Sequence, residues 1–145
     1  MSRDWIIHYV SNNGGCACCG TDKSTGNPSY YSLFGFANAH THGLNNYAHR
    51  ELCAVLDIGI DRVGALLNAM GDRIAKGETT FGEGVRTDVL GNGMPVGFMT
   101  FPGDPTLYVM LPDAEGRLPG DGRCELPYAL QEEYAEIISK HKDYV

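Results

Sequence analysis

LCAVLDIGIDRVGALLNAMGDRIAKG, residues 52–77, is the stretch that decides the fold. Leu52 to Ile58 is an apolar run of strand length with one charged member, Asp57. The segment from Asp61 to Lys76 then repeats its apolar residues at the spacing of one helix face. That face comprises Val63, Leu66, Leu67, Met70 and Ile74. Asp61 is the expected N-cap and Gly77 the expected stop, so the stretch predicts a buried strand followed by an amphipathic helix.

Further strands and a second helix are expected on both sides of this unit. Short runs rich in aromatic and β-branched residues predict the strands, and the apolar spacing after Pro127 predicts a C-terminal helix through Lys140. The strand runs are Trp5–Val10, Tyr30–Ala37, Val96–Phe101 and Leu107–Leu111. The expected fold is a single α+β domain over residues 1–145, with a mixed and mainly antiparallel sheet. The Asp61–Lys76 helix should pack on one of its faces.

Composition excludes several classes of protein. The chain has 145 residues, 43% of them hydrophobic and 20% charged, which is typical of a globular domain. Its net charge is -7, and the residues after 50 alone carry -8, so nucleic acid is not an expected partner. We find no apolar run of membrane-spanning length and no secretion signal at the start. The cysteine count is odd, which together with these features predicts a reduced, cytoplasmic protein.

Several local motifs occur in an order and spacing that resemble a known family. They are Tyr30–Phe36 (YYSLFGF), His49–Leu52 (HREL), Leu66–Gly71 (LLNAMG) with Gly77, and Pro112-Asp113 with Gly116-Arg117 and Pro119. Together they resemble the family named domain of unknown function 4262, over about residues 30–121. Arg50 stands where the family has proline, and the loop from Ala39 to Tyr47 differs. The resemblance implies a small α/β domain from bacteria or their viruses and brings no activity with it.

The cysteines of the long loop from Ser11 to Pro28 suggest a metal site. Cys16 and Cys19 have the spacing by which two thiolates of one knuckle bind zinc. Two more ligands are needed, and His40 and His42 are the preferred pair, with Cys53 and Cys124 as other candidates. The alternative is a reduced loop without metal. Zinc is therefore the one cofactor that the sequence predicts.

Three other residues are candidates for catalysis or for structural roles. His49 and Glu51 enter the buried strand on one face and could orient each other as an acid–base pair. In the structural alternative, Glu51 caps the preceding loop and His49 binds a buried carbonyl group. Arg117 could hold a carboxylate or phosphate, or could form an ion pair with Asp113 or Asp121.

These observations leave two functions open. The first is a binding or regulatory protein, of immunity or antagonist type, whose partner is a protein or a small molecule. It fits the small size, the acidity and the absence of a recognisable nucleophile constellation. The second is a small zinc-assisted hydrolase that uses the cysteine and histidine loops. The sequence does not decide between them, nor does it predict an oligomeric state.

Overall fold

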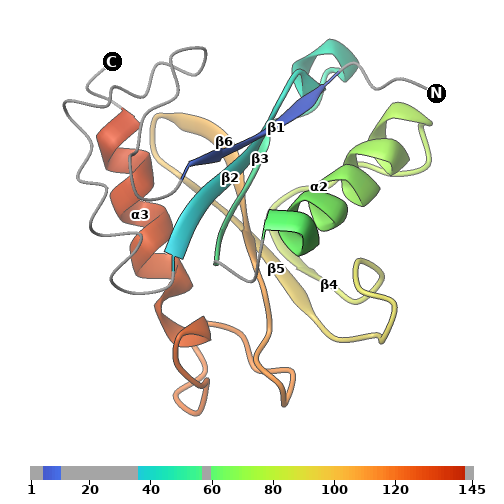
Figure 1. The fold of residues 1–145 in the computed structure, drawn as a ribbon. Coiled ribbons are helices and arrows are strands. Elements are labelled where there is room, and N and C mark those ends of the chain that lie inside the picture. Colours follow the sequence, from blue (N-terminus) through green and yellow to red (C-terminus); the bar gives the residue numbers. More distant parts are fainter. Residues whose placement is uncertain (1–4, 11–35, 57–59, 143–145) are drawn as a thin grey trace.

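The computed structural model describes residues 5–10, 36–56 and 60–142. These residues form an α+β fold made of one sheet and two α-helices (Figure 1). The elements, in chain order, are β1 (Ile6–Val10), β2 (Phe36–His42), η2 (Leu44–Tyr47), β3 (Leu52–Leu56), α2 (Ile60–Ala75), β4 (Gly84–Arg86), β5 (Val96–Phe101), β6 (Asp104–Met110), η3 (Tyr128–Leu130) and α3 (Gln131–Lys142).

The described strands form a six-stranded sheet in the order β1-β2-β3-β6-β5-β4. Only β3 and β6 pair in parallel, and the other neighbours are antiparallel. The prediction of a mixed, mainly antiparallel sheet is therefore confirmed. Every residue of β3 is buried, as expected for a central strand that is covered on both faces.

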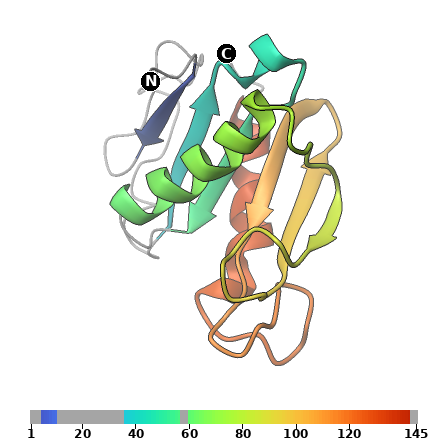
Figure 2. The same cartoon turned by 90° about the vertical axis from the view of Figure 1, so that its right-hand side faces the viewer.

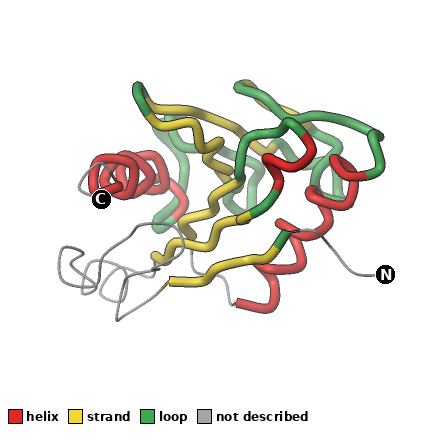
Figure 3. The backbone as a smooth tube through the Cα atoms, turned by 90° about the horizontal axis from the view of Figure 1, so that it is seen from above, coloured by secondary structure: helices red, strands yellow, loops and turns green. Residues whose placement is uncertain are grey.

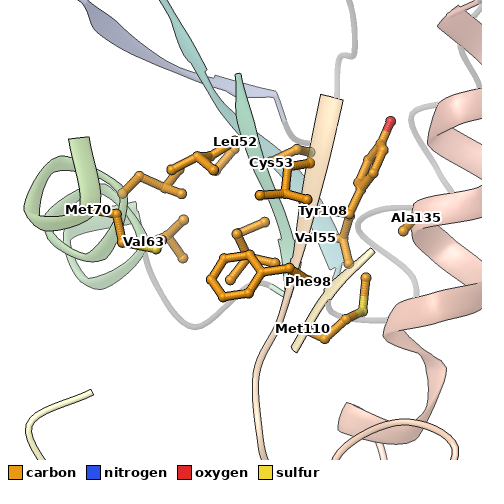
Figure 4. Close-up of a cluster of buried hydrophobic side chains, with 14 of the residues drawn as sticks. Leu52, Cys53, Val55, Val63, Met70, Phe98, Tyr108, Met110 and Ala135 are labelled. Atoms are coloured by element: carbon orange, nitrogen blue, oxygen red, sulfur yellow. The ribbon is translucent and has the colours of Figure 1, made fainter. Parts of the chain in front are cut away.

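The two helices cover opposite faces of the sheet (Figure 3). Val63 and Met70 of α2 point toward Leu52 and Phe98 on one face, whereas Tyr108 and Met110 of β6 point toward α3 on the other (Figure 4). The predicted helix stripe is buried at four of its five positions; Leu66 is half-exposed. The fold is thus three layers, with the parallel pair β3 and β6 at its centre.

Helix α2 begins and ends close to its predicted limits. It starts at Ile60, so Asp61 lies in the first turn and is not the N-cap; its charge there still complements the helix dipole. At the other end, Gly77 has a φ of 73°. The amides of Gly77 and Glu78 bind the carbonyl groups of Ile74 and Arg73, which is the Schellman arrangement. Gly77 is therefore confirmed as the stop.

Trp5 is buried against α2 at a position where a glycine is required. Its indole nitrogen donates a hydrogen bond to the side chain of Asn68 at 3.1 Å. A Cβ atom on Gly71 would lie 2.7 Å from the indole ring. Gly71 therefore lets the first strand approach the helix closely, and a larger residue would push the ring away.

The strand expected to end at Ala37 continues to His42. Phe36 and Ala37, the last residues of the strand expected at Tyr30–Ala37, begin β2 (Phe36–His42), and residues 30–35 lie outside the described part. The polar residues 38–42 thus belong to this strand, and η2 follows it. Pairing with β1 and β3 on both sides satisfies the backbone of this polar stretch, so tertiary hydrogen bonds override its loop-like composition.

Smaller differences concern the second half of the chain. The glycine-rich segment from Glu78 to Pro95 contains the short edge strand β4. The β5–β6 hairpin has a tight turn, because Phe101 already pairs with Asp104. The expected helix from Pro127 to Lys140 is the short η3 turn followed by α3. Among the described residues, no helix has the length and apolar character needed to cross a bilayer.

Candidate functional site

A cleft lies at the end of the sheet where β3 and β6 finish, and we call it the Arg62 cleft. Its volume is about 410 Å3, within the range of about 300–1,000 Å3 that is usual for small-molecule sites. It is lined by Arg62, Leu66, Leu90, Asn92, Met94, Leu111, Pro112 and Tyr128. Crevices at the carboxyl ends of parallel strands are the usual binding places in α/β sheets.

Three segments far apart in the sequence build the walls of the cleft. The first turns of α2 supply Arg62 and Leu66, which are one helical turn apart. The loop before β5 supplies the second wall, and the segment from Leu111 through η3 supplies the third. Figure 2 shows the two loops at the end of the sheet toward which β3 and β6 run. The half-exposed Leu66 is explained by this position, because its outer side faces the cleft and not the core.

Gln131 fixes the wall formed by Leu111. Its side chain is fully buried and accepts a hydrogen bond from the Leu111 amide at 2.8 Å. It also donates to the carbonyl groups of Leu111 at 2.6 Å and Tyr128 at 3.0 Å. These bonds join the end of β6 to the start of α3 and hold Leu111 and Tyr128 in place beside the cleft.

Asp113 organises the loop that continues from Pro112. Its buried carboxylate accepts hydrogen bonds from the amides of Glu115, Arg117 and Glu125 and from the Arg117 side chain. Burial alone would raise the pKa of Asp113, but these donors, led by the Arg117 and Glu125 amides, outweigh it and lower the pKa to about 2. The carboxylate is therefore the charged anchor of the Pro112–Glu125 loop.

A second charged cluster fixes the loop before β5. Asp88 accepts hydrogen bonds from Arg86 at 2.6 Å and Arg73 at 2.9 Å. The hydrogen bond from Arg86 is the main cause of the low pKa of Asp88. Both guanidinium groups also lie over the ring of Phe81, at 5.6 Å for Arg73 and 4.5 Å for Arg86. The loop that carries Leu90, Asn92 and Met94 is thus tied to α2 and to the core.

Glu51 is held as its structural alternative predicts. Its carboxylate accepts hydrogen bonds from the Thr41 hydroxyl and from three amides around the start of η2. Thr41 in turn accepts a hydrogen bond from the Leu52 amide at 2.9 Å. Glu51 therefore caps the turn between β2 and β3.

His49 is also bound on both ring nitrogens. Nε2 accepts a hydrogen bond from the Phe81 amide at 2.9 Å, so the proton must lie on Nδ1, which is 2.7 Å from the Arg50 carbonyl oxygen. We find no hydrogen bond between His49 and Glu51 within the described residues. Their joint catalytic role stays a prediction, and the geometry supplies structural roles for both.

Arg117 forms the ion pair with Asp113 that the sequence offered as one alternative, with an Nε to Oδ2 distance of 3.0 Å. It also binds Glu125 at 3.2 Å. Its guanidinium group is thus occupied by two carboxylates, and it does not line the Arg62 cleft. An anion-binding role for Arg117 stays a prediction.

The predicted zinc ligands fall only partly within the described residues. His40 is buried and His42 exposed on β2, where their spacing of two places both on the face that carries Cys53. Cys16 and Cys19 lie outside the described residues. Among the residues that are described, no three histidine, cysteine or acidic side chains come together as a metal site. The zinc site therefore stays a prediction.

Two other hollows of the described part lie along α3. One lies on the exposed side of α3 and contains three glutamates. The other, beside Phe101, reaches Ser139 and includes the Lys140–Glu136 ion pair. Beneath it, the Tyr108 hydroxyl donates to Asp104 at 2.5 Å, and burial is the main cause of its raised pKa. Tyr108 and Asp104 thus satisfy each other inside the core.

The described residues thus form an α+β fold with a cleft of about 410 Å3 where β3 and β6 end. Comparisons with protein-family models, with curated proteins and with solved structures gave no match. The membership in the family of domain of unknown function 4262 remains a proposal that rests on the sequence motifs alone.

Proposed function

We propose that this chain is a cytoplasmic binding or regulatory domain that takes up a small molecule in the Arg62 cleft. The observation that carries the proposal is the construction of the cleft. Apolar side chains line its walls, the buried hydrogen bonds of Gln131 and two ion pairs nearer the surface hold those walls, and a few polar groups lie among them. Few but well-placed polar groups in an apolar cleft are typical of ligand sites.

The geometry of the candidate catalytic residues favours binding over hydrolysis. The polar atoms of His49, Glu51 and Arg117 are engaged by backbone groups or by carboxylates of the chain itself. A general base or an electrophile needs a free atom within hydrogen-bonding reach of a substrate. The zinc-assisted hydrolase would have to use the cysteines of the long loop, and metal analysis of the purified protein tests it.

The charge of the chain supports the choice of partner. The net charge of -7 gives a surface that repels phosphate backbones, so we propose no nucleic-acid partner. An immunity-type or antagonist-type role is compatible with the cleft if occupancy changes the loops around it. Of the two kinds of partner, we propose a small molecule before a protein, because the described residues form a cleft of suitable size.

Two-dimensional amide NMR with a library of small fragments tests the proposal. We expect bound fragments to shift amides of the cleft walls, and we expect Leu66→Trp to abolish these shifts because the new ring fills the cleft. Ile137→Trp is the matched control, since Ile137 is a half-exposed aliphatic residue of the other helix. Fragments that bind Leu66→Trp and the natural chain equally well would contradict the proposal.

A further inference from the structure

The polar groups of the Arg62 cleft share one property, which is that they can donate hydrogen bonds. Arg62 is the charged side chain of the lining, and it makes no ion pair or hydrogen bond with any described residue. The Tyr128 hydroxyl likewise has no partner within the described part of the chain. The side-chain oxygen of Asn92 accepts from the Met94 amide at 3.0 Å, which leaves its NH2 group as the available donor.

A group that only accepts hydrogen bonds complements this set of donors. A carboxylate offers two oxygens at the spacing of the guanidinium fork and can bind Arg62 in a bidentate manner. An ammonium group would instead meet the like charge of Arg62. The charges around the cleft thus select a ligand with an anionic head.

The remaining lining selects an apolar body and limits the anionic charge. Leu66, Leu90, Met94, Leu111 and Pro112 provide apolar walls, and burial of apolar surface contributes about 25 cal/mol per Å2. A polyphosphate would need several cations, whereas the lining provides one and the chain as a whole is acidic, at -7. A volume of about 410 Å3 lies near the lower end of the usual range for ligand sites.

We propose that the Arg62 cleft binds an amphipathic monocarboxylate, with the carboxylate on Arg62 and the apolar chain or ring against the walls formed by Leu66 and Leu111. This inference rests on the proposed function and adds the ligand class to it. Tyr128 donates a second hydrogen bond to the same carboxylate.

Calorimetry and amide NMR with matched probes test the ligand class at pH 7. The probes are decanoate and 4-phenylbutanoate, which separate chains from rings, together with decanol and decylammonium, which keep an apolar body and change the head. We expect at least one carboxylate to bind at the cleft amides about tenfold or more tightly than decanol, the difference of an added charge-assisted hydrogen bond. Decylammonium should bind most weakly.

Two charge-matched variants decide the role of Arg62. Arg62→Gln should remove the preference for carboxylate over decanol, and Lys76→Gln should keep it. Lys76 is exposed and directly follows the last residue of α2, roughly 20 Å from Arg62 at 1.5 Å per residue, so both variants lose one positive charge but only one loses it at the cleft. Arg62 is exposed, so both variants should fold, which circular dichroism checks.

Different results overturn the two proposals separately. Equal binding of decanol and the carboxylates at the cleft, or unchanged carboxylate affinity in Arg62→Gln, would refute the ligand class and leave a cleft that binds apolar molecules. Shifts that fall outside the cleft would also refute the ligand class. If neither these probes nor the fragment library shifts the cleft amides, the proposed function itself fails.

Discussion

Replacing Gln131 by leucine should lower the free energy of unfolding more than any substitution on the exposed face of α3, because Gln131 holds a wall of the cleft. The substitution keeps a similar volume but removes the partner of the Leu111 amide, the Leu111 carbonyl and the Tyr128 carbonyl. Leu111 is 5% exposed, so water cannot readily replace these bonds. The Tyr128 carbonyl belongs to a half-exposed residue and can be partly solvated.

The expected loss follows from the number of orphaned groups. Each buried polar group left without a partner costs about 1–3 kcal/mol, and two of the three groups belong to the buried Leu111. The new leucine recovers part of this by burying apolar surface. We expect the free energy of unfolding to fall by about 2–4 kcal/mol, which is below the usual total of about 5–15 kcal/mol, so the variant should still fold.

Urea unfolding followed by circular dichroism measures this loss as a lower midpoint at an unchanged slope. Glu133→Leu is the control on the same helix, where an exposed charge in the first turn should cost less than about 1 kcal/mol. Gln131→Glu adds a second check. The glutamate keeps an acceptor for the Leu111 amide but turns an oxygen toward the carbonyl groups of Leu111 and Tyr128. Protonation of the glutamate restores a donor, so the loss of stability of this variant should shrink at acid pH. A loss below about 1 kcal/mol for Gln131→Leu would show that Gln131 does not hold the wall.

The remaining predictions concern the other anchors, the core and the metal. Glu51→Gln should lower the free energy of unfolding by about 2–4 kcal/mol, because the amide nitrogen turns donors toward the amides of Gly43, Leu44 or Asn45; a small effect in urea unfolding would argue against the cap. Asp113→Asn should make the stability of the fold depend less on pH between about pH 4 and pH 2. The pKa of Asp113 is about 2 in the folded chain and higher in the unfolded chain, so its carboxylate stabilises the fold above the unfolded pKa and loses this contribution as the pH falls through the folded pKa. Parallel pH profiles of the variant and the natural chain would refute this. Leu67→Ala should cost about 2–5 kcal/mol, because Leu67 is fully buried on α2; a loss under 1 kcal/mol in thermal or urea unfolding would contradict the packing. Metal analysis of protein purified without chelator should find about one zinc per chain that the joint change Cys16→Ser and Cys19→Ser abolishes, and metal-free natural protein would remove the zinc hypothesis.

The sequence by itself determined the central elements of the fold. The apolar run at Leu52 and the helical stripe from Val63 to Ile74 predicted β3 and α2, because hydrophobic periodicity is a local property. Gly77 predicted the helix end for the same reason, since a positive φ is a requirement of one residue. The structural alternatives for Glu51 and Arg117 were also visible, because their partners lie within about ten residues.

The tertiary structure alone decided the rest. Asn38 to His42 has the composition of a loop and became a strand only because β1 and β3 bind it from both sides. The Arg62 cleft is lined by residues of α2, of the loop before β5 and of η3. Gln131, which holds its wall, donates a hydrogen bond to Leu111, twenty positions earlier in the chain. A binding cleft is made by distant segments whose packing sets their separation, and no local pattern of residue types encodes that distance.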